Sequence, residues 1–126
     1  MQPTFTGINL IADDVLTLAN FYSELLDGEF DGDESWAAVS VPGATLAIFS
    51  TAGMNQMAAG SMEGSGRGGF TIEFNVDDAE AWYERLLASG VPIVKPLTTQ
   101  AWGRRSVWAR DPIGNIINFY QNVPAR

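Results

Sequence analysis

The sequence contains neither cysteine nor histidine. The lack of cysteine excludes thiol nucleophiles, cysteine-ligated metals and disulfides. The lack of histidine removes the commonest general base near neutral pH and the commonest ligand of transition metals. Carboxylates, amides and hydroxyls remain as metal ligands, and they suit Mg²⁺ or Ca²⁺ better than Zn²⁺ or Fe²⁺. Most metalloenzyme chemistry is therefore disfavoured.

Long apolar runs are also lacking. No run approaches the roughly 18 residues that a membrane helix needs. The first residues, Met1-Gln2-Pro3-Thr4, do not have the charged and then apolar pattern of a signal peptide. We therefore expect a soluble, cytoplasmic protein that has no membrane partner.

Basic residues are missing from the first half of the chain. Residues 1–66 contain nine Asp and Glu and no Lys or Arg, whereas the remainder has seven basic against six acidic residues, which gives the net charge of −8. An acidic surface repels phosphate backbones and attracts cations, so we expect no nucleic-acid partner and favour cationic small molecules. Alternatively, the acidity only keeps the protein in solution.

The chain has the size and composition of one folded domain. Its 126 residues are 46% apolar and 17% charged, which excludes a disordered chain. A chain of this length buries roughly two thirds of its unfolded surface and needs no disulfide or structural metal.

The first half shows a β-α-β-β-β order. Phe5–Ile11 is apolar and β-prone, and Asp13-Asp14 follows where a helix needs its N-cap. Apolar residues at helical spacing come next, and Asp27-Gly28 ends the helix. An acidic hairpin, a strand over Trp36–Val41 and a strand over Thr45–Phe49 complete the half.

The same order recurs in the second half, where an offset of 64 places Asp14 on Asp78. This internal repeat predicts an α+β fold with two βαβββ modules in tandem. The expected elements are a strand over Phe70–Val76, a helix after Asp77-Asp78 and strands over Val91–Val94, Arg105–Ala109 and Ile116–Tyr120.

The segment Thr51–Gly69 joins the halves and holds six glycines and three of the four methionines. Glycine predicts a flexible linker, and clustered methionine supplies adaptable apolar surface. A flap over a ligand and a passive connector are both open interpretations.

Two motifs resemble the vicinal oxygen chelate superfamily, which includes glyoxalase I, extradiol dioxygenases and bleomycin-resistance proteins. The first is Asp14 followed by Phe21-Tyr22; the second is Trp102-Gly103 followed by the segment Asp111–Phe119. The resemblance covers nearly the whole chain. It implies one glyoxalase-like domain, 1–126, with modules over 1–50 and 70–123 whose mixed β-sheet forms a cup.

The resemblance also implies where a metal would bind. The metal-dependent members take ligands from positions that correspond to Gly7, Ala47, Thr71 and Asn118. Glycine and alanine have no side-chain ligand, and a threonine with an asparagine compensates a divalent charge poorly. We therefore expect no metal and no other cofactor, which argues against glyoxalase and dioxygenase activity.

Strand alternation points one set of side chains into the expected cup. Glu73 is the one carboxylate expected there: it would act as a general base if desolvated, as an anchor for a bound cation, or as the partner of a neighbouring arginine. Trp82 is expected in the core, and Trp102 is expected to stack on a flat ligand. The predicted ligand-binding residues are Asn9, Trp36, Met54, Met57, Thr71, Glu73, Trp102, Trp108, Asn118 and Tyr120.

These observations favour a metal-independent protein that binds or sequesters a small molecule, similar to the antibiotic-resistance branch of the family. The expected ligand is aromatic and either neutral or cationic, and the expected assembly is a homodimer in which the cup closes within one chain or between two. The alternatives are a metal-independent isomerase or lyase with Glu73 as its base, a glyoxalase-like or dioxygenase-like enzyme relative, and an inactive interaction module.

Overall fold

The computed structural model describes residues 1–66 and 69–126. The chain divides into two compact units, Met1–Ser65 and Gly66–Arg126, which are described separately below. Within the described residues, no helix has both the length and the apolar character that a membrane span requires.

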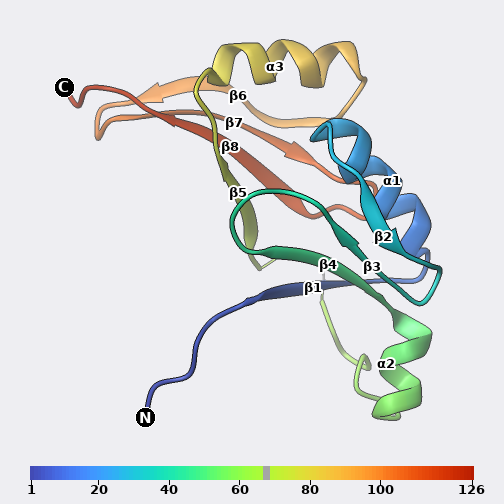
Figure 1. Cartoon of the computed structure of the whole chain (residues 1–126). Helices are drawn as coiled ribbons and strands as arrows, with labels where there is room; N and C mark the ends of the chain where they lie inside the picture. Colours follow the sequence, from blue (N-terminus) through green and yellow to red (C-terminus); the bar gives the residue numbers. More distant parts are fainter. Residues whose placement is uncertain (67–68) are drawn as a thin grey trace. The chain divides into compact units, whose positions relative to one another are not determined.

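The first unit is a four-stranded mixed sheet covered by helix α1 on one face (Figure 1). The strand order is β1-β4-β3-β2, with β1 parallel to β4 and the other pairs antiparallel. Its elements are β1 (Gly7–Ala12), α1 (Val15–Leu25), β2 (Phe30–Gly32), β3 (Trp36–Val39), β4 (Thr45–Ser50) and α2 (Thr51–Met57).

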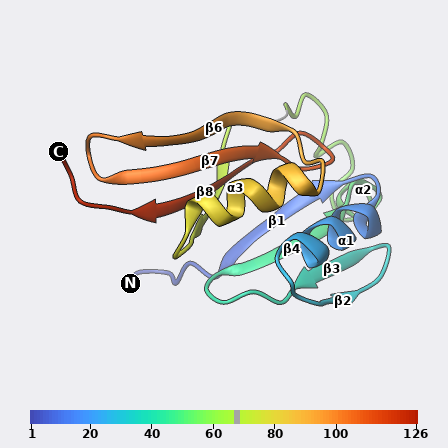
Figure 2. The same cartoon turned by 90° about the horizontal axis from the view of Figure 1, so that it is seen from above.

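The second unit repeats this topology. Its strand order is β5-β8-β7-β6, with β5 parallel to β8, and α3 lies along one face of the sheet (Figure 2). Its elements are β5 (Thr71–Asn75), α3 (Ala79–Ala88), β6 (Ile93–Gln100), β7 (Arg104–Arg110) and β8 (Ile116–Asn122). The predicted α+β fold with tandem βαβββ modules is confirmed.

Both helices that cover the sheets begin at the predicted aspartates. Asp14 accepts a hydrogen bond from the Thr17 N–H at 3.1 Å, and Asp78 accepts one from the Ala81 N–H at 3.1 Å. Each bond satisfies a backbone donor that a helix N-terminus leaves without an intrahelical partner. The caps therefore fix where each helix begins against its sheet.

Asp14 makes the stability of the first unit sensitive to acid. The Thr17 hydroxyl and N–H donate to its carboxylate, and these bonds hold its pKa below the ordinary value of 3.8. A carboxyl with a lowered folded-state pKa stabilises the fold above its unfolded pKa and loses that contribution as pH falls through the folded value. Chemical unfolding measured between pH 6 and pH 2 should therefore show that the free energy of unfolding falls more steeply with decreasing pH for wild type than for Asp14→Asn. Equal pH profiles would contradict this prediction.

The predicted flexible linker over Thr51–Gly69 is wrong at its start, where α2 forms. The Ser50 hydroxyl accepts a hydrogen bond from the Gly53 N–H at 2.8 Å and caps this helix. No residue of α2 is buried, so the helix leaves no apolar periodicity in the sequence. Arg67 and Gly68, at the far end of the predicted linker, lie outside the described residues.

The strand predicted over Val91–Val94 is also misplaced, because β6 runs from Ile93 to Gln100. Its pairing with β7 shifts register between Ile93 and Lys95 and again between Lys95 and Thr98. Pro96 lies within the second shift, where a residue without an N–H is tolerated. The proline obscured the strand in the sequence.

Phe119 is the centre of the core beneath α3. It is fully buried, stacks on Trp82 at 4.6 Å and on Phe74 at 5.4 Å between ring centroids, and so ties α3 to the sheet. Trp82 therefore packs on this core through Phe119, as predicted, and is itself partly exposed. The opposite face of this sheet carries the polar residues described next.

Candidate functional site

One face of the second sheet brings together five of the predicted ligand-binding residues. The register pairs Glu73 with Asn118, and Asn118 with Trp108, so these side chains share a face. We call this surface the Glu73 face. It carries Thr71, Glu73 and Asn75 from β5, Lys95 from β6, Arg104, Ser106, Trp108 and Arg110 from β7, and Asn118 and Tyr120 from β8.

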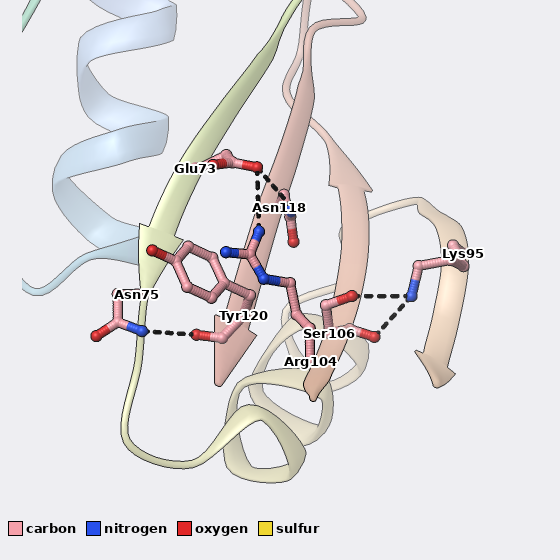
Figure 3. A network of polar contacts seen from close by, with 7 residues as sticks. All are labelled: Glu73, Asn75, Lys95, Arg104, Ser106, Asn118 and Tyr120. Atoms are coloured by element: carbon pink, nitrogen blue, oxygen red, sulfur yellow. Dashed lines mark hydrogen bonds and ion pairs between the residues drawn. The ribbon is translucent and has the colours of Figure 1, made fainter. Parts of the chain in front are cut away.

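Glu73 is partly exposed and already paired. Its Oε1 accepts a hydrogen bond from Asn118 Nδ2 at 3.2 Å and lies 3.6 Å from Arg104 Nη1, while 48% of the side chain is exposed (Figure 3). Of the roles open in the sequence, pairing with a neighbouring arginine is the one observed. The roles of general base and of anchor for a bound cation stay predictions.

Arg104 lies flat against an aromatic ring on the same face. Its guanidinium carbon is 3.7 Å from the centroid of the Tyr120 ring. Stacking of this kind holds the guanidinium plane and leaves its N–H groups directed outward along the edge. The neighbouring Asn75 Nδ2 donates to the Tyr120 carbonyl at 3.4 Å. Tyr120 thus positions Arg104 rather than presenting a bare ring.

Lys95 is a second cation on the Glu73 face. Its Nζ donates to the Ser106 carbonyl at 2.8 Å and to the Ser106 hydroxyl at 3.1 Å, and it lies 5.3 Å from the centroid of the Trp108 ring (Figure 3). Burial lowers the pKa of this ammonium, because desolvation penalises its charged form. The described contacts of Lys95 are to neutral acceptors.

Two buried polar atoms on this face have no hydrogen-bond partner among the described residues. They are Asn118 Oδ1 and Trp108 Nε1, and Asn118 is only 5% exposed. The amide nitrogen of Asn118 points toward Glu73, because a carboxylate accepts hydrogen bonds and only the nitrogen of the amide can donate one. The amide oxygen, Oδ1, therefore points away from Glu73. An acceptor and a donor are therefore left unsatisfied on adjacent strands, which buried groups rarely are.

The first sheet holds two other predicted residues. Trp36 Nε1 donates to Asn9 Oδ1 at 3.2 Å, and Trp36 is 43% exposed. The register places Ala47 beside Asn9 and Phe49 beside Trp36, so the indole lies on a largely apolar face. Asn9 fixes the orientation of an exposed aromatic platform.

The remaining predicted residues are not on the strands of either sheet. Trp102 is in the turn between β6 and β7 and is 73% exposed. Met54 and Met57 belong to α2. Trp102 therefore does not belong to a strand of the Glu73 face, and the methionine flap stays a prediction.

The positions that hold a metal in metal-dependent relatives do not fit one here. Gly7 and Ala47 have no side-chain donor, Thr71 lies beside Ile116, and the amide nitrogen of Asn118 is bonded to Glu73. In the described ranges, 1–66 and 69–126, no three Asp or Glu gather as a cation site would require.

Lys95, Ser106 and Arg104 were not among the ligand-binding residues predicted from the sequence. Alternation along β7 would have shown that Arg104 and Ser106 share a face with Trp108. Lys95 could not be placed in this way, because the register shifts in β6 interrupt the alternation.

Comparisons with known proteins agree with this architecture. The model of the Glyoxalase/Bleomycin resistance protein/Dioxygenase superfamily matches residues 4–119. An uncharacterized protein of Mycobacterium bovis is 31% identical over 125 residues, which cover 91% of this chain and 81% of the relative.

Solved structures show the same fold. A glyoxalase/bleomycin resistance protein/dioxygenase family enzyme from Burkholderia phytofirmans superimposes with a TM-score of 0.84 at 12% identity and covers 94% of this chain and 98% of its own. A lactoylglutathione lyase from Agrobacterium tumefaciens gives a TM-score of 0.76 at 21% identity and covers 95% and 94%. The chain belongs to the Glyoxalase/Bleomycin resistance protein/Dioxygenase superfamily.

Proposed function

We propose that this protein binds or sequesters a small molecule on the Glu73 face and does so without a metal, as in the antibiotic-sequestering branch of the superfamily. The observation that carries the proposal is the pair of buried, unpartnered atoms, Asn118 Oδ1 and Trp108 Nε1. Leaving a buried donor or acceptor unsatisfied costs about 1–3 kcal/mol. Both atoms are closed to solvent, so a ligand that displaces the side chains over them and supplies the missing partners recovers this free energy on binding.

The contacts of Glu73 bear on the alternative of a metal-independent isomerase or lyase with Glu73 as its base. Both the Asn118 amide and the Arg104 guanidinium converge on Oε1. A general base needs a free lone pair within hydrogen-bond reach of the substrate proton. Oε2 takes part in neither contact, so the two contacts hold the carboxylate in position on the face, and the isomerase or lyase is distinguished by an activity measurement.

Ligand screening monitored by intrinsic fluorescence tests the binding role. Ligands that bind the Glu73 face should change the emission of wild-type protein, and Trp108→Phe should abolish most of that change because it removes both the fluorophore and the unpartnered donor. Trp82→Phe, on the covered face of the same sheet, is the matched control and should retain the response. Turnover that disappears in Glu73→Gln would instead favour the enzyme.

Metal independence gives a separate prediction. Because Gly7 and Ala47 offer no side-chain donor and Asn118 is bonded to Glu73, the purified protein should contain no stoichiometric transition metal. Elemental analysis after mild purification measures this directly, and chelator treatment should leave the melting temperature unchanged. Near-stoichiometric Zn, Ni, Fe or Mn, lost together with thermal stability on chelation, would contradict the prediction.

A further inference from the structure

We propose that the ligand of the Glu73 face is a small planar carboxylate that carries a hydrogen-bond donor next to its carboxyl group. This inference rests on the proposed function and names its ligand class. It runs against the net charge of −8, which by itself favours cationic ligands.

The local charge on the Glu73 face has the opposite sign to that of the whole chain. Among its described residues, Lys95, Arg104 and Arg110 are basic and Glu73 is the single acid. A ligand on this face meets these groups at short range, where their field outweighs that of distant exposed charges, which solvent and salt screen. A cation placed here would face like charges, whereas an anion would be attracted.

Arg104 is arranged to take a second carboxylate. Its separation of 3.6 Å from Glu73 exceeds the about 2.7–2.9 Å of a charge-assisted hydrogen bond. A guanidinium has five N–H donors, and stacking on Tyr120 fixes the plane in which they point. A planar carboxylate in that plane could form a bidentate hydrogen bond with the guanidinium, which Glu73 does not form.

Lys95 adds a second source of attraction for an anion. Its ammonium is held by the neutral carbonyl and hydroxyl of Ser106, and burial lowers its pKa. A nearby negative charge offsets such a desolvation penalty by favouring the protonated form. Figure 3 shows Lys95 on β6 and Arg104 on the neighbouring strand β7, which also carries Ser106, while Asn118 is on β8.

The two unpartnered atoms define the rest of the ligand. Trp108 Nε1–H requires an acceptor, which a carboxylate oxygen supplies. Asn118 Oδ1 requires a donor, which a bare carboxylate lacks, so an adjacent hydroxyl or amine must provide it. The anion thus satisfies the cations and the indole, and the neighbouring donor satisfies the asparagine.

Three commercially available probes test this assignment: salicylate, its neutral amide salicylamide, and the cation benzamidine. Each is titrated at constant ionic strength while the indole N–H signals of the four tryptophans are followed by ¹H–¹⁵N NMR, with Trp108 assigned from Trp108→Phe. Salicylate should move the Trp108 signal and bind at least about tenfold tighter than salicylamide, because a charge-assisted bond is roughly twice as strong as a neutral one. Benzamidine should bind more weakly than either.

Neighbouring arginines on opposite faces provide a matched pair of variants. Arg104→Gln should weaken salicylate about tenfold or more, and Arg104→Lys should recover only part of the affinity, because lysine keeps the charge and loses the planar fork. Arg105→Gln should leave the affinity within about twofold, since Arg105 pairs with Glu80 at 3.7 Å on the α3 side. Equal losses in Arg104→Gln and Arg105→Gln would show a general charge effect and overturn the proposal.

The outcomes separate this inference from the proposed function. If salicylamide or benzamidine shifts the Trp108 signal at lower concentration than salicylate does, the anionic ligand class is wrong and the Glu73 face remains a binding site. If no probe shifts the Trp108 signal at any soluble concentration, both the ligand class and the assignment of this face are overturned.

Discussion

Phe119→Ala is expected to lower the free energy of unfolding by about 3–5 kcal/mol, the range for truncating a buried aromatic residue. The Phe119 ring is fully buried between Trp82 and Phe74, so its removal leaves a cavity with two large rings on its walls. Neither ring can close the cavity without moving α3 or β5, to which it belongs. Urea unfolding followed by circular dichroism measures the loss.

Two further variants make this prediction specific. Phe119→Leu fills most of the cavity and should lose less than half as much stability. Leu87→Ala, at an exposed position of α3, should change it by no more than about 0.5 kcal/mol. If Phe119→Ala loses under about 1 kcal/mol, the stacked rings are not the centre of this core.

Asp111→Ala is expected to lower the free energy of unfolding by about 2–4 kcal/mol, because several buried donors lose one acceptor group. The buried Asp111 carboxylate accepts from the Ile113 N–H at 3.1 Å, from the Asn115 N–H at 2.9 Å and from Asn115 Nδ2 at 2.9 Å. The turn they close connects β7 to β8, so Arg104 and Asn118 depend on it for their register.

The side chain of Asp111 can be tested without removing it completely. Asp111→Asn keeps one acceptor oxygen and should lose less stability than Asp111→Ala, whereas Asp13→Ala, which removes an exposed acid, should change stability by no more than about 0.5 kcal/mol. Calorimetry of the three variants measures the order of their stabilities. Loss of salicylate binding in Asp111→Asn with unchanged stability would show that the turn acts on the site and not on the fold.

The fold could be predicted from the sequence because its main determinants are local. Asp14 and Asp78 cap their helices through residues three positions away, and such spacing is visible without a structure. The end of β6 could not be predicted from local spacing. Its residues through Gln100 form a strand because β7 pairs with them, and this pairing depends on side chains that come later in the chain.

The candidate site could be predicted only in part, for the same reason. Alternation correctly placed Glu73, Asn118 and Tyr120 on one face. It could not show that Arg104 reaches Glu73, since the two residues meet only through the register of β7 with β8 and of β8 with β5. The net charge of −8 therefore did not reveal that Lys95 and Arg104 gather near Glu73 on this face.

Odd and even positions of strand β8 face opposite sides of the sheet, so substitutions at them have different consequences. Residues 117 and 119 face the core, and residues 118 and 120 face solvent-side polar groups. Substitutions at odd positions therefore act on the core, whereas substitutions at even positions change the polar face on which the proposed ligand would lie. The two even positions differ in cost, because Asn118 is buried and bonded to Glu73 whereas Tyr120 is partly exposed, so we expect a lineage carrying this strand to vary first at position 120.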